Sequence, residues 1–248
     1  MKILVCISSV PDTTSKINFT ADKSAFDKNG IQWVINPLDE FGLTKAIKLQ
    51  ESAGATVTVI NVGDASTEPV IRKSLAIGAN DAIRINVEPK DSFSVAKEIA
   101  NIAQSGGYDL ILCGKESIDY NGGAVPGMVA QLLNQPFVNG CVGLDVNGSE
   151  ATSVREIDGG KEIIAASLPL VIGGQKGLVE EKDLRIPNMR GIMTARTKAL
   201  TVLEPVSASV ETKAVKFEKP AAKSAVKLVS ADNLDELISL LHNEAKVI

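Results

Sequence analysis

Residues 107–128 hold the groups whose types and spacing best suit chemistry with a ligand. Residues 108–114 form a nearly unbroken apolar run, which is typical of a strand buried in a parallel sheet. A polar loop and the glycine-rich residues 122–127 then lead into an apolar helix start. Glycines let a backbone approach a ligand closely, and a helix start offers free N–H groups to an anion. The stretch therefore has the features of a phosphate-binding loop.

This glycine pattern matches neither of two familiar phosphate-binding motifs. The spacing GxGxxG is absent, and Gly114-Lys115 is followed by Glu116 where a P-loop carries Ser or Thr. A connection that only turns the chain from a strand into a helix has the same composition. The local sequence favours these two interpretations about equally.

The composition argues against several other kinds of site. The formal net charge is −4 and no long run of Lys or Arg occurs, so we expect no nucleic-acid partner. The three cysteines show neither metal-ligand nor CxxC spacing, and His242 is the single histidine. The chain thus lacks the residues for a Ser-His-Asp triad or a multi-histidine metal site. We therefore expect no metal site.

The elements that position the glycine loop alternate between strand and helix. Strands are predicted at residues 2–10, 56–62 and 82–87, and helices follow them at 37–54, 70–78 and 94–103. This alternation predicts an α/β fold with a doubly wound, mainly parallel sheet and helices on both faces. Ligands of such sheets bind outside the carboxyl ends of the strands, which is where the glycine loop would lie.

Other segments extend this core. Residues 17–19 and 31–35 flank a polar stretch and predict a small hairpin or flap. Segments 137–146, 152–157 and 162–172 are β-like and are joined by Asn147-Gly148 and by residues 158–160, so they predict added antiparallel strands. The first residues, MKILVCISSV, are typical of a strand rather than a signal peptide, and we expect a cytoplasmic location.

The last quarter of the chain is less regular. Residues 183–198 show no clean period and contain Pro187 and Gly191. We predict a domain over residues 1–202 and an extended arm over 203–248, which ends in an amphipathic helix with apolar residues from Leu234 to Leu241. That helix suits docking on another subunit, but its period slightly favours folding back onto its own domain.

Taken together, these segments resemble the beta subunit of electron transfer flavoprotein from end to end. The most specific block is VREIDGGKE at residues 154–162, followed by LPLVI at 168–172. Supporting segments are Asn36-Pro37 and residues 75–79, 112–119 and 191–196. Their order and spacing carry the resemblance, because none of them is sufficient alone.

The resemblance implies an adenine-nucleotide-binding fold similar to that of universal stress proteins. It implies a heterodimer with an alpha subunit that holds most of an FAD shared by both subunits. Such a heterodimer takes electrons from flavin dehydrogenases, such as the acyl-CoA dehydrogenases of fatty acid oxidation, and passes them to a membrane quinone oxidoreductase. The resemblance therefore implies an electron carrier without side-chain catalysis, in which the FAD performs the redox chemistry and the beta subunit supplies orientation and distance.

The resemblance also implies a second nucleotide on this subunit, which is AMP in ordinary members and a second FAD in electron-bifurcating ones. Gly122-Gly123 differs from the longer polar side chains of ordinary members and from the Asp-Gly-Asp-Thr pattern of bifurcating ones. Residues 10–13 are more similar to bifurcating relatives. We favour AMP and keep the second FAD as the alternative.

The resemblance carries the family's nucleotide contacts onto the predicted strand ends and the glycine loop. They are Cys6, Asn36, Pro37, Leu38, Asp39, Val62, Gly114, Lys115, Glu116, Ser117, Ile118, Asp119, Tyr120, Asn121, Gly122, Gly123, Ala124 and Val125. The N–H groups of residues 122–125 are expected to hold the phosphate, and Asp119 to fix the loop or a ribose hydroxyl.

Residues 183–198 correspond to the family's partner-recognition loop, where a leucine enters a pocket on the dehydrogenase. Met189 takes that position here, with Arg190, Ile192 and Met193 beside it. Glu156 is expected to brace this loop or to support the flavin environment, and a surface salt bridge is the simpler alternative.

Two rival functions fit the same fold class. A stand-alone ATP-binding regulatory domain of the stress-protein type leaves the second half of the chain without a role. An ATP-using ligase or pyrophosphatase needs an SGGxDS-type loop after the first strand, and residues 7–10 read Ile-Ser-Ser-Val.

Overall fold

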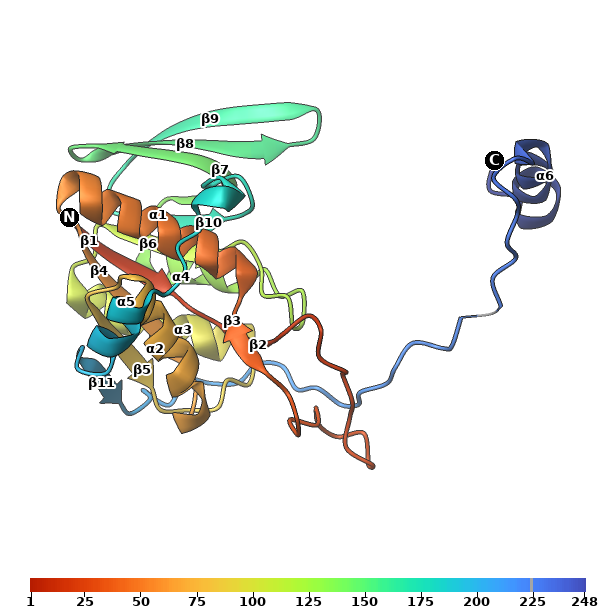
Figure 1. The fold of residues 1–248 in the computed structure, drawn as a ribbon. Coiled ribbons are helices and arrows are strands. Elements are labelled where there is room, and N and C mark those ends of the chain that lie inside the picture. Colours follow the sequence, from red (N-terminus) through yellow and green to blue (C-terminus); the bar gives the residue numbers. More distant parts are fainter. Residues whose placement is uncertain (224) are drawn as a thin grey trace.

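The computed structural model describes residues 1–223 and 225–248. Its main sheet has nine strands in the order β11-β5-β4-β1-β6-β10-β7-β8-β9 (Figure 1). The strands are β1 (Lys2–Cys6), β4 (Thr56–Val62), β5 (Asp81–Ile85), β6 (Leu110–Gly114), β7 (Phe137–Asn147), β8 (Glu150–Ile157), β9 (Gly160–Ser167), β10 (Leu170–Gly174) and β11 (Leu200–Leu203). Within this sheet β8 runs opposite to the other eight strands, so the predicted α/β class with a mainly parallel sheet is confirmed.

Helices cover both faces of this sheet. One core joins α1 (Pro37–Ala53) and α2 (Glu68–Ile77) to strand residues such as Ile3 and Val5. The other core joins α3 (Ser92–Gly106) and α4 (Val125–Leu133) to the alternate strand residues, such as Leu4. Successive side chains of a strand point to opposite faces, so a nearly continuous apolar strand serves two cores.

The helix ends follow the predicted signals. The first turn of α1 begins with Pro37 after Asn36, and the helix ends at Gly54 in the left-handed conformation. Asp91 and Ser94 form a capping box at the start of α3. Two short 3₁₀ turns, Ala65–Thr67 and Glu181–Asp183, complete the helical elements of the body together with α5 (Met189–Ala195).

The predicted antiparallel extension is confirmed, but its last strand was wrong. Gly148 and Gly159 take the positive φ angles that the two hairpin turns need. The segment predicted at 162–172 is two strands, because Pro169 has no N–H for a continuous ladder. After the break, β10 enters the sheet between β6 and β7 and pairs in parallel with both.

The predicted flap also forms with a different pairing. The strand expected at residues 2–10 is shorter, because β1 ends at Cys6. A separate strand, β2 (Ser9–Pro11), pairs antiparallel with β3 (Trp33–Ile35). Residues 17–19 were therefore the wrong partner for 31–35, and Phe19 instead forms an isolated bridge with Phe26. Residues 12–32 between the two strands constitute the flap.

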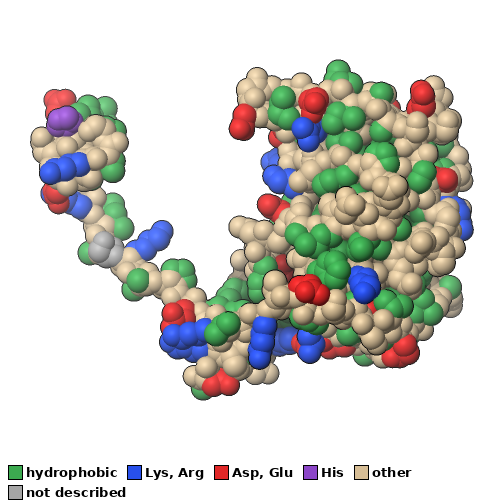
Figure 2. Space-filling model, turned by 180° about the vertical axis from the view of Figure 1, so that it is seen from behind, with side chains coloured by type: hydrophobic (Ala, Val, Ile, Leu, Met, Phe, Trp, Pro, Cys, Tyr) green, Lys and Arg blue, Asp and Glu red, His purple; other side chains and the backbone are tan. Residues whose placement is uncertain are grey.

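The arm leaves the body, contrary to the folding-back prediction. Residues 204–219 cross the surface and contact the flap, where the Phe217 N–H donates to the Lys23 carbonyl at 2.9 Å and Phe217 stacks on Phe19. The chain then extends away to α6 (Leu234–Ser239) and a π-helical turn, Leu240–Ala245. Figures 1 and 2 show this terminal helix standing apart from the body. The division at residue 203 stays a prediction.

Within the described part of the chain, none of the helices combines the length and apolar character that a membrane crossing requires.

Candidate functional site

The carboxyl ends of β1 and β6 are held together by one buried carboxylate, that of Asp39 near the start of α1. Asp39 is only 4% exposed. Its Oδ2 accepts from the Ser8 N–H at 2.7 Å, and its Oδ1 accepts from the Gly114 N–H at 2.8 Å. Two adjacent strand ends and a helix start are therefore fixed by a single side chain.

Burial has a marked electrostatic effect on this carboxyl. Desolvation raises the pKa of Asp39 to about 7, although its hydrogen bonds with Ser8, Asn36 and Gly114 act in the opposite direction. Gly114 has to be glycine, because a Cβ there would overlap Asp39 Oδ1. The close approach of these two residues sets the position at which the following loop begins.

Asn36 fixes that loop from the other side. The residue is 0% exposed, its Nδ2 donates to the Glu116 carbonyl at 2.9 Å, and its Oδ1 accepts from the Ile118 N–H at 3.3 Å. The side chains of Asn36 and Asp39, both predicted as ligand contacts, are therefore committed to bracing residues 114–118. We call residues 114–125 the rim loop.

The rim loop is also closed by its own hydrogen bonds. Ser117 and Gly122 exchange two backbone hydrogen bonds, at 3.0 and 3.2 Å. Asp119 Oδ1 accepts from Ser117 Oγ at 2.5 Å and from the Tyr120 N–H at 2.9 Å. Of the two roles expected for Asp119, these contacts support fixing the loop. The Gly122 N–H was predicted to hold the phosphate. It donates to the Ser117 carbonyl instead, so it is not free for a phosphate.

Three N–H groups remain at the end of the rim loop. Gly123, Ala124 and Val125 lie at the beginning of α4, where backbone N–H groups have no helical acceptor. No side chain caps this helix start, and Pro126 within its first turn has no N–H to offer. The arrangement can accept an anionic oxygen through backbone groups.

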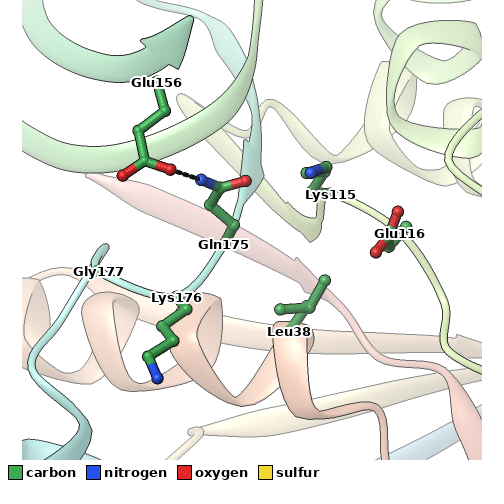
Figure 3. A pocket seen from close by; sticks show the side chains of 7 residues that line it. All are labelled: Leu38, Lys115, Glu116, Glu156, Gln175, Lys176 and Gly177. Atoms are coloured by element: carbon green, nitrogen blue, oxygen red, sulfur yellow. Dashed lines mark hydrogen bonds between the residues drawn. The ribbon is translucent and has the colours of Figure 1, made fainter. Parts of the chain in front are cut away.

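A first hollow of about 500 Å³ opens beside the rim loop. It is lined by Leu38, Lys115, Glu116, Glu156, Gln175, Lys176 and Gly177 (Figure 3). Gln175 Nε2 donates to Glu156 Oε2 at 2.6 Å, which ties the end of β8 to the loop after β10. The lining carries both positive and negative groups and suits a polar, partly charged ligand.

Glu156 was expected either to brace residues 183–198 or to support the flavin environment. Its side chain lines the first hollow and bonds Gln175, so these contacts do not support the bracing role. Sequence reasoning missed Gln175, Lys176 and Gly177 as lining residues. The Gly173-Gly174 pair at the end of a buried apolar strand was the available signal, because Gly114 ends β6 in the same way.

A second hollow of about 190 Å³ lies at the ends of β4 and β5. Its lining includes Val62, the start of α3 and the arm residues Ser207, Ala208 and Val210. Glu98 holds the arm there, because both of its carboxylate oxygens lie 3.0 Å from the Val206 N–H. Val62, a predicted nucleotide contact, therefore lines a different hollow from Leu38 and Lys115.

Cys6 and Cys113 lie at the buried floor of this edge, on neighbouring strands. A hydrogen bond between the two thiols, together with burial, raises the pKa of Cys6 well above its usual value. The Cys6 thiol is therefore neutral and is not a nucleophile, and Cys113 is a buried side chain beside it. The part of the chain that the structure describes contains no cluster of three potential metal ligands.

Residues 183–198 line neither hollow: residues 183–185 contact α1, and α5 lies on α2. Sequence reasoning expected no regular structure here, but α5 begins at Met189 because Asn188 Oδ1 accepts from the Gly191 N–H at 2.7 Å. Met189 is 75% exposed, and Arg190, Ile192 and Met193 are exposed as well. Ile186, which the sequence did not single out, is 81% exposed.

Comparison with known proteins identifies relatives along the whole chain. The electron transfer flavoprotein domain model matches residues 24–208. Electron transfer flavoprotein subunit beta of Bacillus subtilis is 35% identical over 262 aligned positions, covering 100% of both chains. The protein of the same name from Syntrophomonas wolfei is 34% identical over 91% of this chain and 88% of its own. The mitochondrial subunit of Oryza sativa subsp. japonica is 31% identical over 100% of both chains.

Proposed function

This chain belongs to the electron transfer flavoprotein family as a beta subunit, and from that premise we propose that it carries electrons in a heterodimer with an alpha subunit. The proposed donors are flavin dehydrogenases such as acyl-CoA dehydrogenases. The proposed acceptor is a membrane quinone oxidoreductase. The two alternative functions, an ATP-using enzyme and a stand-alone ATP-binding regulatory domain, do not explain the first hollow, the exposed α5 or the arm.

We propose that the residues lining the first hollow form this chain's part of the flavin site. FAD held mainly by the alpha subunit supplies the one-electron chemistry. Glu156 and Gln175 are bonded to each other and keep a fixed polar wall, and Lys115 and Lys176 add positive charge beside it. The residues of this chain therefore orient the ligand and exclude water on one side, without taking part in covalent chemistry.

The nucleotide bound by this subunit alone is proposed to be AMP. The observation that supports it is the uncapped start of α4, where Gly123, Ala124 and Val125 offer backbone N–H groups next to a loop braced by Asn36 and Asp39. A phosphate there takes the place of the missing side-chain cap. AMP would stabilise the folded chain according to its occupancy.

The proposed dehydrogenase contact is the recognition segment, residues 183–198. Exposed apolar side chains on a short surface helix are typical anchors of a transient interface. Met189 and Ile186 project most from this segment, and the flexible methionine side chain adapts to an irregular pocket.

The deciding experiment is to purify the chain with its alpha subunit, denature the heterodimer and quantify the released nucleotides by chromatography. One FAD and one AMP per heterodimer support the proposal. Two FAD and no AMP would mean that the rim loop holds a second redox cofactor, as in bifurcating relatives. ATP alone, without flavin or a recovered partner, would overturn the proposed electron-carrier role.

A matched pair of variants tests the rim loop itself. Gly123→Asp places a carboxylate beside the N–H groups proposed for the phosphate, and we expect AMP to be lost while FAD is retained. Gly160→Asp makes the same change at an exposed glycine with open space around it. Equal AMP content in both variants would exclude the start of α4 as the phosphate site.

A further inference from the structure

The helix α5 buries few side chains that could hold it in place. It contains seven residues, and only Ala195 is buried, at 3% exposure. A helix of two turns is marginal in water unless tertiary contacts support it. The orientation of its exposed side chains therefore depends on the groups that fasten it to the body.

The first fastening comes from Arg72 in α2. Its Nη1 donates to the Ala195 carbonyl and to the Lys198 carbonyl, both at 2.9 Å. Its Nε donates to Glu68 Oε1 at 3.1 Å, which fixes the guanidinium plane. A cation at the carboxyl end of a helix satisfies free carbonyl groups and interacts favourably with the helix dipole.

The second fastening runs in the opposite direction. Lys198, just after α5, donates from Nζ to the Leu75 carbonyl at 2.9 Å and to the Ala79 carbonyl at 2.6 Å. These carbonyls belong to the last turn of α2 and the residues after it. Each of the two helices thus has its carboxyl end capped by a cation from the other segment.

Close backbone contact sets the angle between the two helices. A Cβ at Gly191 would overlap the Ala76 carbonyl oxygen, so α5 approaches α2 as closely as glycine permits. The beginning of the recognition segment is tied separately to α1, where Lys48 Nζ donates to Asp183 Oδ2 at 2.7 Å. Both ends of the segment are fixed, and its apolar residues project between them.

We propose that Arg72 and Lys198 are positioning residues for electron acceptance, because they hold α5 in the orientation that presents Met189 and Ile186 to a dehydrogenase. This inference rests on the proposed role of the recognition segment. Without either cation α5 samples other orientations, and only a fraction of heterodimers is ready to bind. The apparent affinity for the dehydrogenase falls by that fraction.

The test compares Arg72→Met and Lys198→Met with the control Lys73→Met. Lys73 lies beside Arg72 on α2 and pairs with Glu40 of α1 at 2.9 Å, so its loss removes the same charge without touching α5. Each variant is purified as the heterodimer with the alpha subunit. It is then assayed with an acyl-CoA dehydrogenase that reduces the wild-type heterodimer.

Both test variants are expected to raise the KM for the heterodimer by about ten-fold, with kcat and flavin content unchanged. The control is expected to stay within about two-fold of wild type. Trypsin cleavage after Arg190 gives a readout that needs no dehydrogenase. It is expected to be about ten-fold faster in both test variants, because α5 opens more often.

Several outcomes overturn the inference. One is a KM and a cleavage rate that match those of Lys73→Met. Another is a KM that rises in Met189→Ala and Ile186→Ala but stays unchanged in Arg72→Met and Lys198→Met. That result would overturn the positioning role of the two cations and would leave the docking role of the recognition segment intact. An unchanged KM in the Met189→Ala, Ile186→Ala double variant removes the proposed docking role, and with it the inference, even when cleavage is faster.

A double-mutant comparison separates positioning from general destabilisation. Arg72→Met is expected to raise KM much less when Met189 and Ile186 are already Ala, because the side chains that it positions are gone. Equal increases in both backgrounds would show that Arg72 acts by another route. If Arg72→Met does not yield a heterodimer, Lys198→Met decides alone, since it leaves the Arg72–Glu68 ion pair in place.

Discussion

The rim loop and the recognition segment both present groups outward, but different parts of the protein hold them. Buried polar side chains, Asn36 and Asp39, brace the rim loop from beneath. Partly exposed cations, Arg72 and Lys198, fasten the recognition segment from the side. A buried polar group that loses its partner costs more free energy than an exposed one. Changes beneath the rim loop should therefore affect folding, and changes around α5 should affect encounters with a partner.

The largest effect is expected at Gly114. Gly114→Ala brings a Cβ into Asp39 Oδ1 and should lower the free energy of unfolding by about 3 kcal/mol. Gly122→Ala is the matched control, because open space surrounds that position and the change should stay within about 0.5 kcal/mol. Urea unfolding of both variants measures the difference. Similar values for the two would show that Asp39 does not confine the backbone.

Asp39→Asn is expected to cost about 2 kcal/mol at pH 5, since an amide NH₂ then faces one of the two backbone N–H donors. The pKa of Asp39 is raised to about 7 in the folded protein, so wild-type stability should fall as pH rises from about 4 to 7. The neutral Asn has no such dependence, and the gap between the two proteins should narrow toward pH 8. Urea unfolding at pH 5 and pH 8 tests this. A gap that widens toward pH 8 would show that the two N–H donors outweigh burial.

At the recognition segment the expected effect is kinetic. Met189→Ala and Ile186→Ala should each raise the KM for electron acceptance about five-fold, with flavin content and unfolding free energy unchanged. Ile163→Ala is the control, because Ile163 on β9 is similarly exposed but lies outside the segment. Loss of flavin from the Met189 variant would instead assign a structural role to α5.

The smallest effect is expected from the end of the arm. Removal of residues 220–248 should change the unfolding free energy of the body by no more than about 0.5 kcal/mol, because the terminal helix stands apart from it. Thermal unfolding of the full and shortened chains measures this. A clear loss of stability would mean that the terminal helix packs on its own domain, which the periodicity of Leu234 to Leu241 had favoured.

Features that depend on neighbouring residues could be predicted from the sequence. The apolar runs of β1, β4 and β6, the start of α1 at Pro37 and the hairpin turns at Gly148 and Gly159 all follow from local conformational preference. The rim loop was located in the same way, because Gly114 follows a buried strand. The glycine-rich residues 122–127 predicted a helix start, and α4 begins there with the free N–H groups of residues 123–125.

Features that depend on distant residues could not be predicted in this way. The position of β10 between β6 and β7 arises from pairing across more than fifty residues with β6, and no local pattern encodes it. Likewise, the inward orientation of Asn36 and Asp39 depends on backbone N–H groups from Ser8, Gly114 and Ile118. The helix α5 was missed because Gly191 lowers the local helix propensity. A glycine is needed at this position because the Ala76 carbonyl of α2 lies too close for a side chain.

The insertion of β10 between β6 and β7 also has a consequence for synthesis of the protein. When residue 147 has left the ribosome, β6 and β7 exist, but the strand that belongs between them does not. Both strands keep open edges until residue 174 emerges, a wait of roughly one to five seconds at a synthesis rate of about 5–20 residues per second. During that interval the nascent chain exposes two unpaired strand edges, at which another strand could pair wrongly.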